Sequence, residues 1–294
     1  RTACVFAQRS TAGRAWHFTG CTTVQWALRQ QSLCTVDYWE TLRRSRWVEP
    51  RCIPPSTRPL NPSSQAFRTL IESEAPDPRD AKEVIARAVH AGFLATDAQL
   101  LEYAAKAMDH YTASTAATAL VVGNILTVAH VGDSKVAIGQ VKPGSTVGRF
   151  LTFDHKPNLV EELARIEAAG GELAYLHGGK PFLRGGDFME RKDRGERPMQ
   201  LNYSRAFGGK DLKPYGLICT PEVLQIDLLP EDKVLILGSD GLWDVINPND
   251  AVATAIEARR LGNDPATELV DLALVEHDVK RTVDNVTCVV VFVD

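Results

Sequence analysis

The stretch LILGSDGLWDVI, residues 235–246, decides the fold of this chain. It opens with an aliphatic run that stops at Gly238, which is typical of a buried strand. Asp240 and Asp244 follow, four positions apart, with Gly241 between them. An ionised carboxylate beside a core is costly unless it is paired, hydrogen-bonded or bound to a cation. These two acids therefore need an explanation that the strand alone does not give.

Two further strands border on an aspartate in the same way. The run ILTVAHVGDS (125–134) delivers Asp133, and VDNVTCVVVFV (283–293) begins at Asp284. Each aspartate could cap a turn, because Asp-Gly, Gly-Asp and Asp-Asn pairs favour turns. Together they could also hold Mg²⁺ or Mn²⁺, which prefer oxygen ligands and activate water against a phosphoryl group. Spacing alone does not show that the carboxylates meet, so both interpretations stay open.

The surrounding periodicity predicts helices and an antiparallel hairpin. Apolar residues recur at helical spacing from Pro78 to about Met108, with a break or bend near Gly92, which predicts one long helix or two. Two β-rich runs joined by Gly123-Asn124 predict the hairpin. Further predicted elements are a helix over 158–169 that Asn158 caps with Glu161, strands over 223–229, 233–239 and 287–293, and helices over about 249–261 and 265–276. This mixture indicates layered α/β or α+β packing.

The chain divides into a poorly patterned N-terminal segment and a well patterned remainder. Residues 1–61 lack clear periodicity and end in a Pro- and Ser-rich stretch, so we expect an atypical segment that is disordered or wrongly delimited. Its Arg-rich, acid-poor composition also fits an organelle transit segment. Residues 62–294 form the expected domain, and their Gly-rich, charged stretch 176–200 should leave the core as a long loop.

Composition excludes several functional classes. The chain has 294 residues and a net charge of -4, so we expect neither a nucleic-acid partner nor an anionic membrane partner. No apolar run reaches the roughly 18 residues that a membrane span needs. The cysteines show neither a CxxC spacing nor an accompanying histidine pattern, which argues against a zinc site and indicates a reducing compartment. We expect a cytoplasmic or nuclear protein and leave organelle targeting open.

Six motifs follow one another along the chain: VAHVGDSKVAIG, LTFDHKP, LNYSRAFGGKDLK, PEV, LGSDGLWDV and DNVTCVVV. In this order they closely resemble the motifs of the metal-dependent protein serine/threonine phosphatases, the PPM-type or protein phosphatase 2C family. The resemblance runs from about residue 80 to the end. It implies an α+β fold in four layers, a β-sandwich of two antiparallel sheets flanked by helices, with an incomplete or irregular N-terminal part here.

The resemblance also implies an activity and a set of metal ligands. The family hydrolyses phosphoserine and phosphothreonine in phosphoproteins with a water held by two Mg²⁺ or Mn²⁺ ions. Asp240 and Asp284 correspond to ligands of this metal pair, Asp133 to the ligand of a looser third ion, and Asp244 to a position near that third ion. Charge neutralisation and a positioned nucleophile are what phosphoryl transfer chiefly needs. We expect a monomer.

Other residues of these motifs are expected to have structural roles. Leu242 and Trp243 should pack in the core, and Arg205 should be an internal salt-bridge partner rather than a substrate contact. His155 and Lys156 are expected to be structural polar groups instead of an acid or a base.

The stretch 176–200 coincides with a variable flap beside the family's active site. We hypothesise that Lys180, Arg184 or nearby groups influence the choice of phosphoprotein. A solvated loop without such a role is the alternative.

The family's N-terminal Asp-Gly-His-Gly motif does not occur in this chain, whose one Asp-Gly pair is Asp240-Gly241. In the family the Asp of this motif bridges both metals and the His protonates the leaving group, so the catalytic and substrate-binding residues are unknown here. Two alternatives stay open: a phosphatase whose N-terminal motif is missing from this chain, or a pseudophosphatase that acts as a regulatory binding scaffold. For the chain as it stands we predict weak or absent catalysis.

Overall fold

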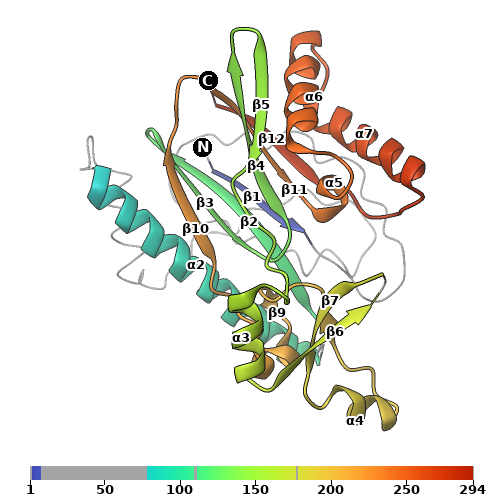
Figure 1. Ribbon diagram of the computed structural model, residues 1–294. Coiled ribbons are helices and arrows are strands. Elements are labelled where there is room, and N and C mark those ends of the chain that lie inside the picture. The colour runs from blue at the N-terminus through green and yellow to red at the C-terminus, as the bar shows by residue number, and fades with distance from the viewer. Residues whose placement is uncertain (1, 8–77, 109–110, 177, 294) are drawn as a thin grey trace.

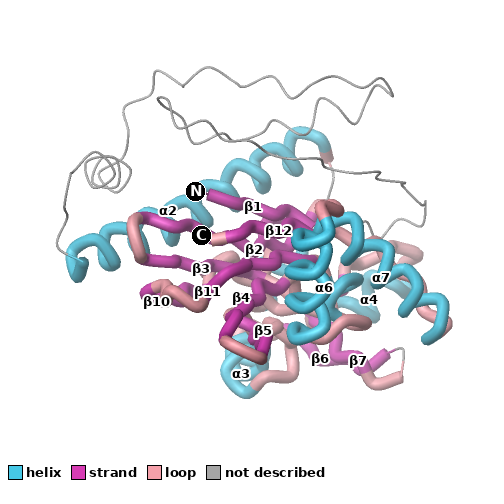
Figure 2. The backbone as a smooth tube through the Cα atoms, turned by 90° about the horizontal axis from the view of Figure 1, so that it is seen from above, coloured by secondary structure: helices cyan, strands magenta, loops and turns pink. Residues whose placement is uncertain are grey.

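Two antiparallel sheets lie face to face in the computed structural model, which describes residues 2–7, 78–108, 111–176 and 178–293 (Figure 1). Helix α2 lies outside one sheet, and α6 and α7 lie outside the other (Figures 1 and 2). This is the four-layer sandwich that the resemblance implied. Within the described residues, no helix is both long enough and apolar enough to cross a membrane.

The first sheet has five strands in the order β1-β2-β3-β10, with β9 paired to β2. Strands β2 and β3 are the predicted hairpin, and Gly123 in its turn has a φ of 59°, which glycine adopts without strain. β1 pairs with β2 along its whole length and lies in the segment where periodicity predicted no strand. The strands are β1 (Thr2–Ala7), β2 (Ala113–Val122), β3 (Ile125–Val131), β9 (Phe207–Gly208) and β10 (Glu222–Asp227).

The second sheet has the order β12-β11-β4-β5. Its strands are β4 (Lys135–Lys142), β5 (Ser145–Phe150), β11 (Asp232–Gly238) and β12 (Cys288–Phe292). Leu235 and Leu237 of β11 pack against the first sheet, whereas Val234 and Ile236 pack beneath the outer helices. Because both faces of β11 are covered, its sequence is an unbroken apolar run instead of an alternating one.

The outer helices cover the sheets with apolar faces. α2 (Pro78–Ala107) is one continuous helix, so of the two predicted alternatives the single long helix is confirmed and a break at Gly92 is not found. It packs on the first sheet through residues such as Phe93 and Leu100. α6 (Pro248–Leu261) and α7 (Pro265–Lys280) pack on the second sheet. Both begin with a capping side chain, since Asn247 accepts from Asp250 N–H and Asp264 from Thr267 N–H.

The predicted loop over 176–200 is largely regular structure. β6 (Gly171–Leu176), β7 (Lys180–Gly185) and β8 (Gln200–Leu201) form a third sheet away from the sandwich, and α4 (Phe188–Asp193) follows β7 (Figure 1). Leu183 and Met199 of this stretch join a small core with the helix α3 (Val160–Ala168) and the 3₁₀ helix η2 (Lys210–Tyr215). Low overall hydrophobicity therefore concealed strands that need only a few buried side chains.

The predicted cap of α3 is also wrong. The residue before the helix is Leu159, in an extended conformation, and no side chain caps the first turn. The helix thus begins later than the pattern Asn158-x-x-Glu161 indicated. The second acid of the turn, Glu162, points inward and is buried.

Close contact between β5 and α6 generates a stability prediction. A Cβ added at Gly148 would lie 2.0 Å from Pro248 O, a backbone atom that cannot move cheaply. We expect Gly148→Ala to lower the free energy of unfolding in urea by about 1–3 kcal/mol through overpacking. In the matched control Gly92→Ala, no atom lies within 4 Å of the new methyl group, and the helix should gain about 0.5–1 kcal/mol. Equal unfolding midpoints for the two variants would contradict the packing described.

Candidate metal site

Asp240 lies where β11 ends and the short helix α5 (Asp240–Trp243) begins. Ser239 N–H donates to Thr287 O at 3.0 Å, and Ser239 Oγ accepts from Thr287 N–H at 3.1 Å. A Cβ added at Gly241 would lie 2.3 Å from Asn285 O and 3.4 Å from Asp284 Cβ. The segment that carries Asp240 is therefore held directly against the segment that carries Asp284.

Both carboxylates also make hydrogen bonds within their own turns. Asp240 Oδ1 accepts from Gly241 N–H at 3.0 Å, and Asp284 Oδ1 accepts from Asn285 N–H at 2.8 Å. The buried His277 of α7 fixes the same turn, because its Nε2 lies 2.7 Å from Gly241 O. The turn role and the ligand role are thus compatible, since these bonds orient the carboxylates.

Asp133 lies in the turn between β3 and β4 and is only 4% exposed. The preceding Gly132 has a φ of 93°, and a Cβ there would lie 2.2 Å from Thr115 Cγ2, so this turn requires glycine. Gly238 at the end of β11 pairs with Lys135 on one side and Cys288 on the other. The register therefore brings Asp133 to the end of the second sheet where Asp240 and Asp284 lie.

Residues 153–156, here called the 153–156 loop, are fastened to the turn that carries Asp133. His155 N–H donates to Gly132 O at 3.0 Å, and Gly132 N–H donates to His155 Nδ1 at 3.1 Å. At the start of the loop, His130 Nε2 lies 2.7 Å from Phe153 O. Both backbone polar groups of Gly132 are thus satisfied by one residue of the loop.

Lys156 compensates the charge of the buried Asp133. Its Nζ donates to Asp133 Oδ2 at 2.6 Å and lies 3.7 Å from Asp154 Oδ2, while Lys135 Nζ is 3.1 Å from Asp154 Oδ1. Burial alone would lower the pKa of Lys156, but Asp133, Asp154 and Asp240 together raise it, so the side chain is charged. Asp133 and Asp240 therefore act on the same ammonium group.

The three aspartates offer donor atoms of the right chemical type for a divalent cation, because carboxylate oxygens are the ligands that Mg²⁺ and Mn²⁺ prefer. They do not by themselves form a closed ligand set. Across the part of the chain that the structure describes, the set of three side chains whose ligand atoms all lie within 4.8 Å of one another is His130, His155 and Glu222. Further oxygen donors would be needed to complete a site around Asp133, Asp240 and Asp284.

The set of His130, His155 and Glu222 has a geometry that argues against metal binding. The two rings stack at 4.4 Å with an angle of 17°, so their in-plane lone pairs lie in two separate, nearly parallel planes and not in a common plane that one ion could share. Because His155 Nδ1 accepts from Gly132 N–H, its Nε2 carries the hydrogen and offers no lone pair. Burial, then the neighbouring His130, lowers the pKa of His155 to about 3, so its contact of 3.5 Å with Glu222 is not an ion pair at pH 7. We interpret this set as support for the 153–156 loop.

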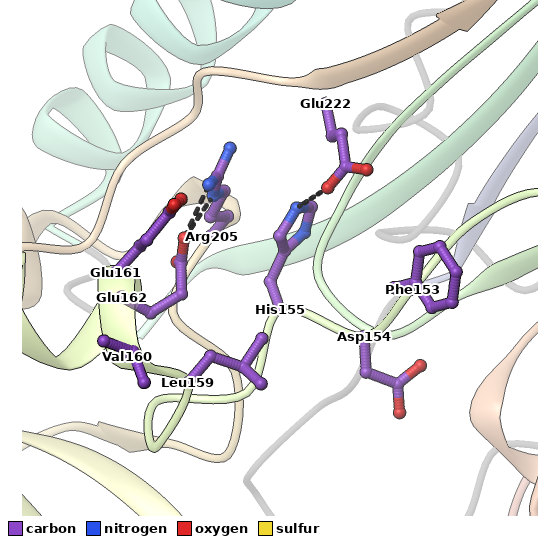
Figure 3. A pocket seen from close by; sticks show the side chains of 9 residues that line it. All are labelled: Phe153, Asp154, His155, Leu159, Val160, Glu161, Glu162, Arg205 and Glu222. Carbon is purple, nitrogen blue, oxygen red and sulfur yellow. Dashed lines mark hydrogen bonds and ion pairs between the residues drawn. The ribbon is translucent and has the colours of Figure 1, made fainter.

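A pocket of about 220 Å³ opens beside this loop (Figure 3). Arg205 Nη2 lies 2.5 Å from Glu162 Oε1, and Arg165 Nη2 lies 2.6 Å from Glu162 Oε2. Burial would raise the pKa of Glu162, but hydrogen bonds from Arg165, Arg205 and Ser204 hold it well below its usual range. Arg205 is thus the internal partner that we predicted. The lining residues are Phe153, Asp154, His155, Leu159, Val160, Glu161, Glu162, Arg205 and Glu222.

The remaining predicted residues lie apart from Asp133, Asp240 and Asp284 or beside them. Asp244 is exposed at the C-cap of α5, one turn beyond Asp240. Trp243 is buried as predicted, and its Nε1 donates to Lys135 O and Gly238 O, both at 3.1 Å. In the flap, Arg184 Nε donates to Gln200 Oε1 at 2.8 Å, whereas Lys180 is exposed.

Sequence reasoning did not identify two of the supporting contacts. Lys156 was expected only as a structural polar group, and the motif DHKP gives no sign that its lysine reaches Asp133. His277 lies in a helix whose sequence shows no link to Gly241. The segment 8–77, where an N-terminal motif was expected and not found in the sequence, lies outside the described residues.

Comparison with known proteins shows which family this chain is similar to. Residues 63–282 match the family described as Protein phosphatase 2C. The chain is 37% identical over 178 residues to "Probable protein phosphatase 2C 76" of Arabidopsis thaliana, covering 60% of this chain and 36% of that protein. It is 37% identical over 197 residues to "Probable protein phosphatase 2C member 13, mitochondrial" of Oryza sativa subsp. japonica, covering 67% of this chain and 47% of that protein. The chain thus spans about half or less of the length of these curated relatives.

A solved structure is also similar. The serine-threonine phosphatase 2C from Toxoplasma gondii superposes with a TM-score of 0.75 at 40% sequence identity, covering 79% of this chain and 75% of that chain. The similarity therefore covers most of this chain.

The buried imidazole of His155 generates a pH prediction. Its folded-state pKa of about 3 lies below the ordinary value of 6.5, so the unfolded chain binds a proton first as the pH falls. The stability that the neutral buried imidazole contributes is fully present above about pH 6.5 and is lost as the pH falls toward 3. Urea unfolding should show a free energy that decreases between pH 7 and pH 5, by at most about 1.4 kcal/mol per pH unit for this group.

The variant His155→Asn should reduce this slope, because one of two buried imidazoles that take up a proton on unfolding is removed; His130, whose pKa burial also lowers, remains. The variant His90→Asn, at a half-buried position on α2, should keep the wild-type slope. If His155→Asn and wild type lose stability at the same rate between pH 7 and pH 5, the neutral buried state of His155 is wrong.

Proposed function

The chain belongs to the protein phosphatase 2C family. We propose that it acts as a protein serine/threonine phosphatase, which hydrolyses phosphoserine and phosphothreonine with a metal-activated water. The observation that carries the proposal is the convergence of three strand-end aspartates, Asp133, Asp240 and Asp284, at one end of the second sheet. Single turn-capping residues would have no reason to gather in this way. Residues 62–294 would form the phosphatase domain.

Each carboxylate has a distinct role in this proposal. Asp240 and Asp284, whose segments lie against each other, would hold the metal pair, and Asp133 with Asp244 would hold a looser third ion. Bound Mg²⁺ or Mn²⁺ would lower the pKa of a water and neutralise phosphoryl oxygens. The chain's own part is to orient these oxygens through turn hydrogen bonds, such as that from Gly241 N–H to Asp240 Oδ1 at 3.0 Å.

We further propose that the chain as it stands is a weak catalyst. Its sequence contains no Asp-Gly-His-Gly motif, so the bridging carboxylate and the proton donor expected in this family have no counterpart. A second candidate function, a pseudophosphatase that acts as a regulatory scaffold, is favoured by the ion pair of Asp133 with Lys156. This pair keeps the buried carboxylate stable without a metal.

Substrate choice would be influenced by the flap over 176–200. Arg184 is engaged by Gln200 and lies over the Phe188 ring at 4.1 Å, so it contributes mainly to the flap's own structure. Lys180, exposed at the start of β7, is the better candidate for contact with an acidic or phosphorylated segment. Phosphoproteins are the proposed partners of a monomeric chain. The proposed location is cytoplasmic or nuclear, and the rice relative described as mitochondrial is the reason to test an organelle as well.

Hydrolysis of a phosphothreonine peptide in the presence of Mn²⁺ tests the function. We expect a slow, Mn²⁺-dependent release of phosphate that Asp240→Asn reduces at least about tenfold, because a ligand of the metal pair is lost. Asp271→Asn, at an exposed position on α7, is the matched control and should leave the rate unchanged.

Turnover at ordinary enzyme rates would overturn the proposed weakness of this chain. A rate that does not depend on Mn²⁺ or on Asp240 would overturn the metal-dependent function. Calorimetry that detects no Mn²⁺ binding by a folded chain, together with a captured protein partner, would support the scaffold instead.

A further inference from the structure

We propose that the ammonium group of Lys156 is a built-in counterion of Asp133 that competes with a divalent cation for this carboxylate. The inference rests on the proposed function, because it concerns one of the carboxylates assigned there to metal binding. It adds a positioning residue that sets how tightly the third ion is held.

Lys156 is fixed beside Asp133 by backbone contacts, unlike a flexible surface lysine. The residue before Lys156, His155, makes two hydrogen bonds to Gly132, the residue before Asp133. Ser204 N–H also donates to His155 O at 2.8 Å, which fastens the loop on its other side. The two turns therefore keep a constant separation, and the ammonium group lies at 2.6 Å from Asp133 Oδ2.

The charges around the pair explain the competition. Asp133 is almost fully buried, so removing its counterion leaves a costly charge and a divalent ion would be a suitable replacement. Two cations on the same carboxylate repel each other, and the divalent ion would bind only as Lys156 withdraws. Asp154 Oδ2, 3.7 Å from Lys156 Nζ, is the carboxylate to which the ammonium group can shift.

Mn²⁺ titration followed by electron paramagnetic resonance tests the proposal on the whole chain. Lys156→Gln should bind Mn²⁺ about tenfold more tightly than wild type, a ratio that corresponds to about 1.4 kcal/mol. The control is Lys82→Gln, which removes a lysine of α2 whose partner is Asp227 and should leave the affinity unchanged. The double variant Lys156→Gln with Asp133→Asn should lose the gain, which assigns it to Asp133.

Equal Mn²⁺ affinity in wild type and Lys156→Gln, or a gain that survives Asp133→Asn, would overturn the proposal while leaving the proposed function intact. Absence of Mn²⁺ binding to wild type and every variant would overturn both.

A second measurement does not depend on a variant that folds. Acylation of lysine amines in wild type, read by mass spectrometry, should modify Lys156 several-fold faster when Mg²⁺ is added, because the ion displaces the ammonium group from Asp133. The rate at Lys82, whose partner is Asp227, should stay constant. An unchanged rate at Lys156 under Mg²⁺ concentrations that saturate the chain would contradict the competition.

Discussion

A carboxylate that is removed from water needs an opposite charge beside it, and the buried Asp133 imposes this requirement on one whole end of the sandwich. Lys156 meets it in the structure, at 2.6 Å. The bond is possible only because the 153–156 loop is fastened to Gly132, whose conformation and close contact with Thr115 exclude a side chain. Sequence, turn geometry and electrostatics thus converge on one ion pair beside the candidate metal site.

The central strand β11 makes that site possible. Its two neighbours in the sheet, β4 and β12, both pair with Gly238, so the turn before β4, the end of β11 and the start of β12 meet at one place. Each of these three points carries an aspartate. The chain belongs to the protein phosphatase 2C family. The chemistry of that family needs clustered oxygen ligands for divalent ions, and the three aspartates are such ligands.

Much of this architecture follows from local sequence. The unbroken run of β11 predicted a buried strand, and Gly123-Asn124 predicted the hairpin, because both signals depend on neighbouring residues. The pairing of Lys156 with Asp133 and the support of Gly241 by His277 join residues far apart in the sequence, so no periodicity contains them. The family motifs, and not their spacing, indicated which acids belong together. The third sheet was missed because its core uses few apolar side chains.

The central claim is that Asp240 and Asp284 together bind a divalent ion in this chain. Crystals soaked in Mn²⁺ and measured by anomalous diffraction test it most directly, because the signal locates the ion without reference to activity. We predict a peak between the carboxylates of Asp240 and Asp284, with a weaker one near Asp133. A peak at His130, His155 and Glu222 instead, or none at any aspartate under saturating Mn²⁺, would contradict the claim.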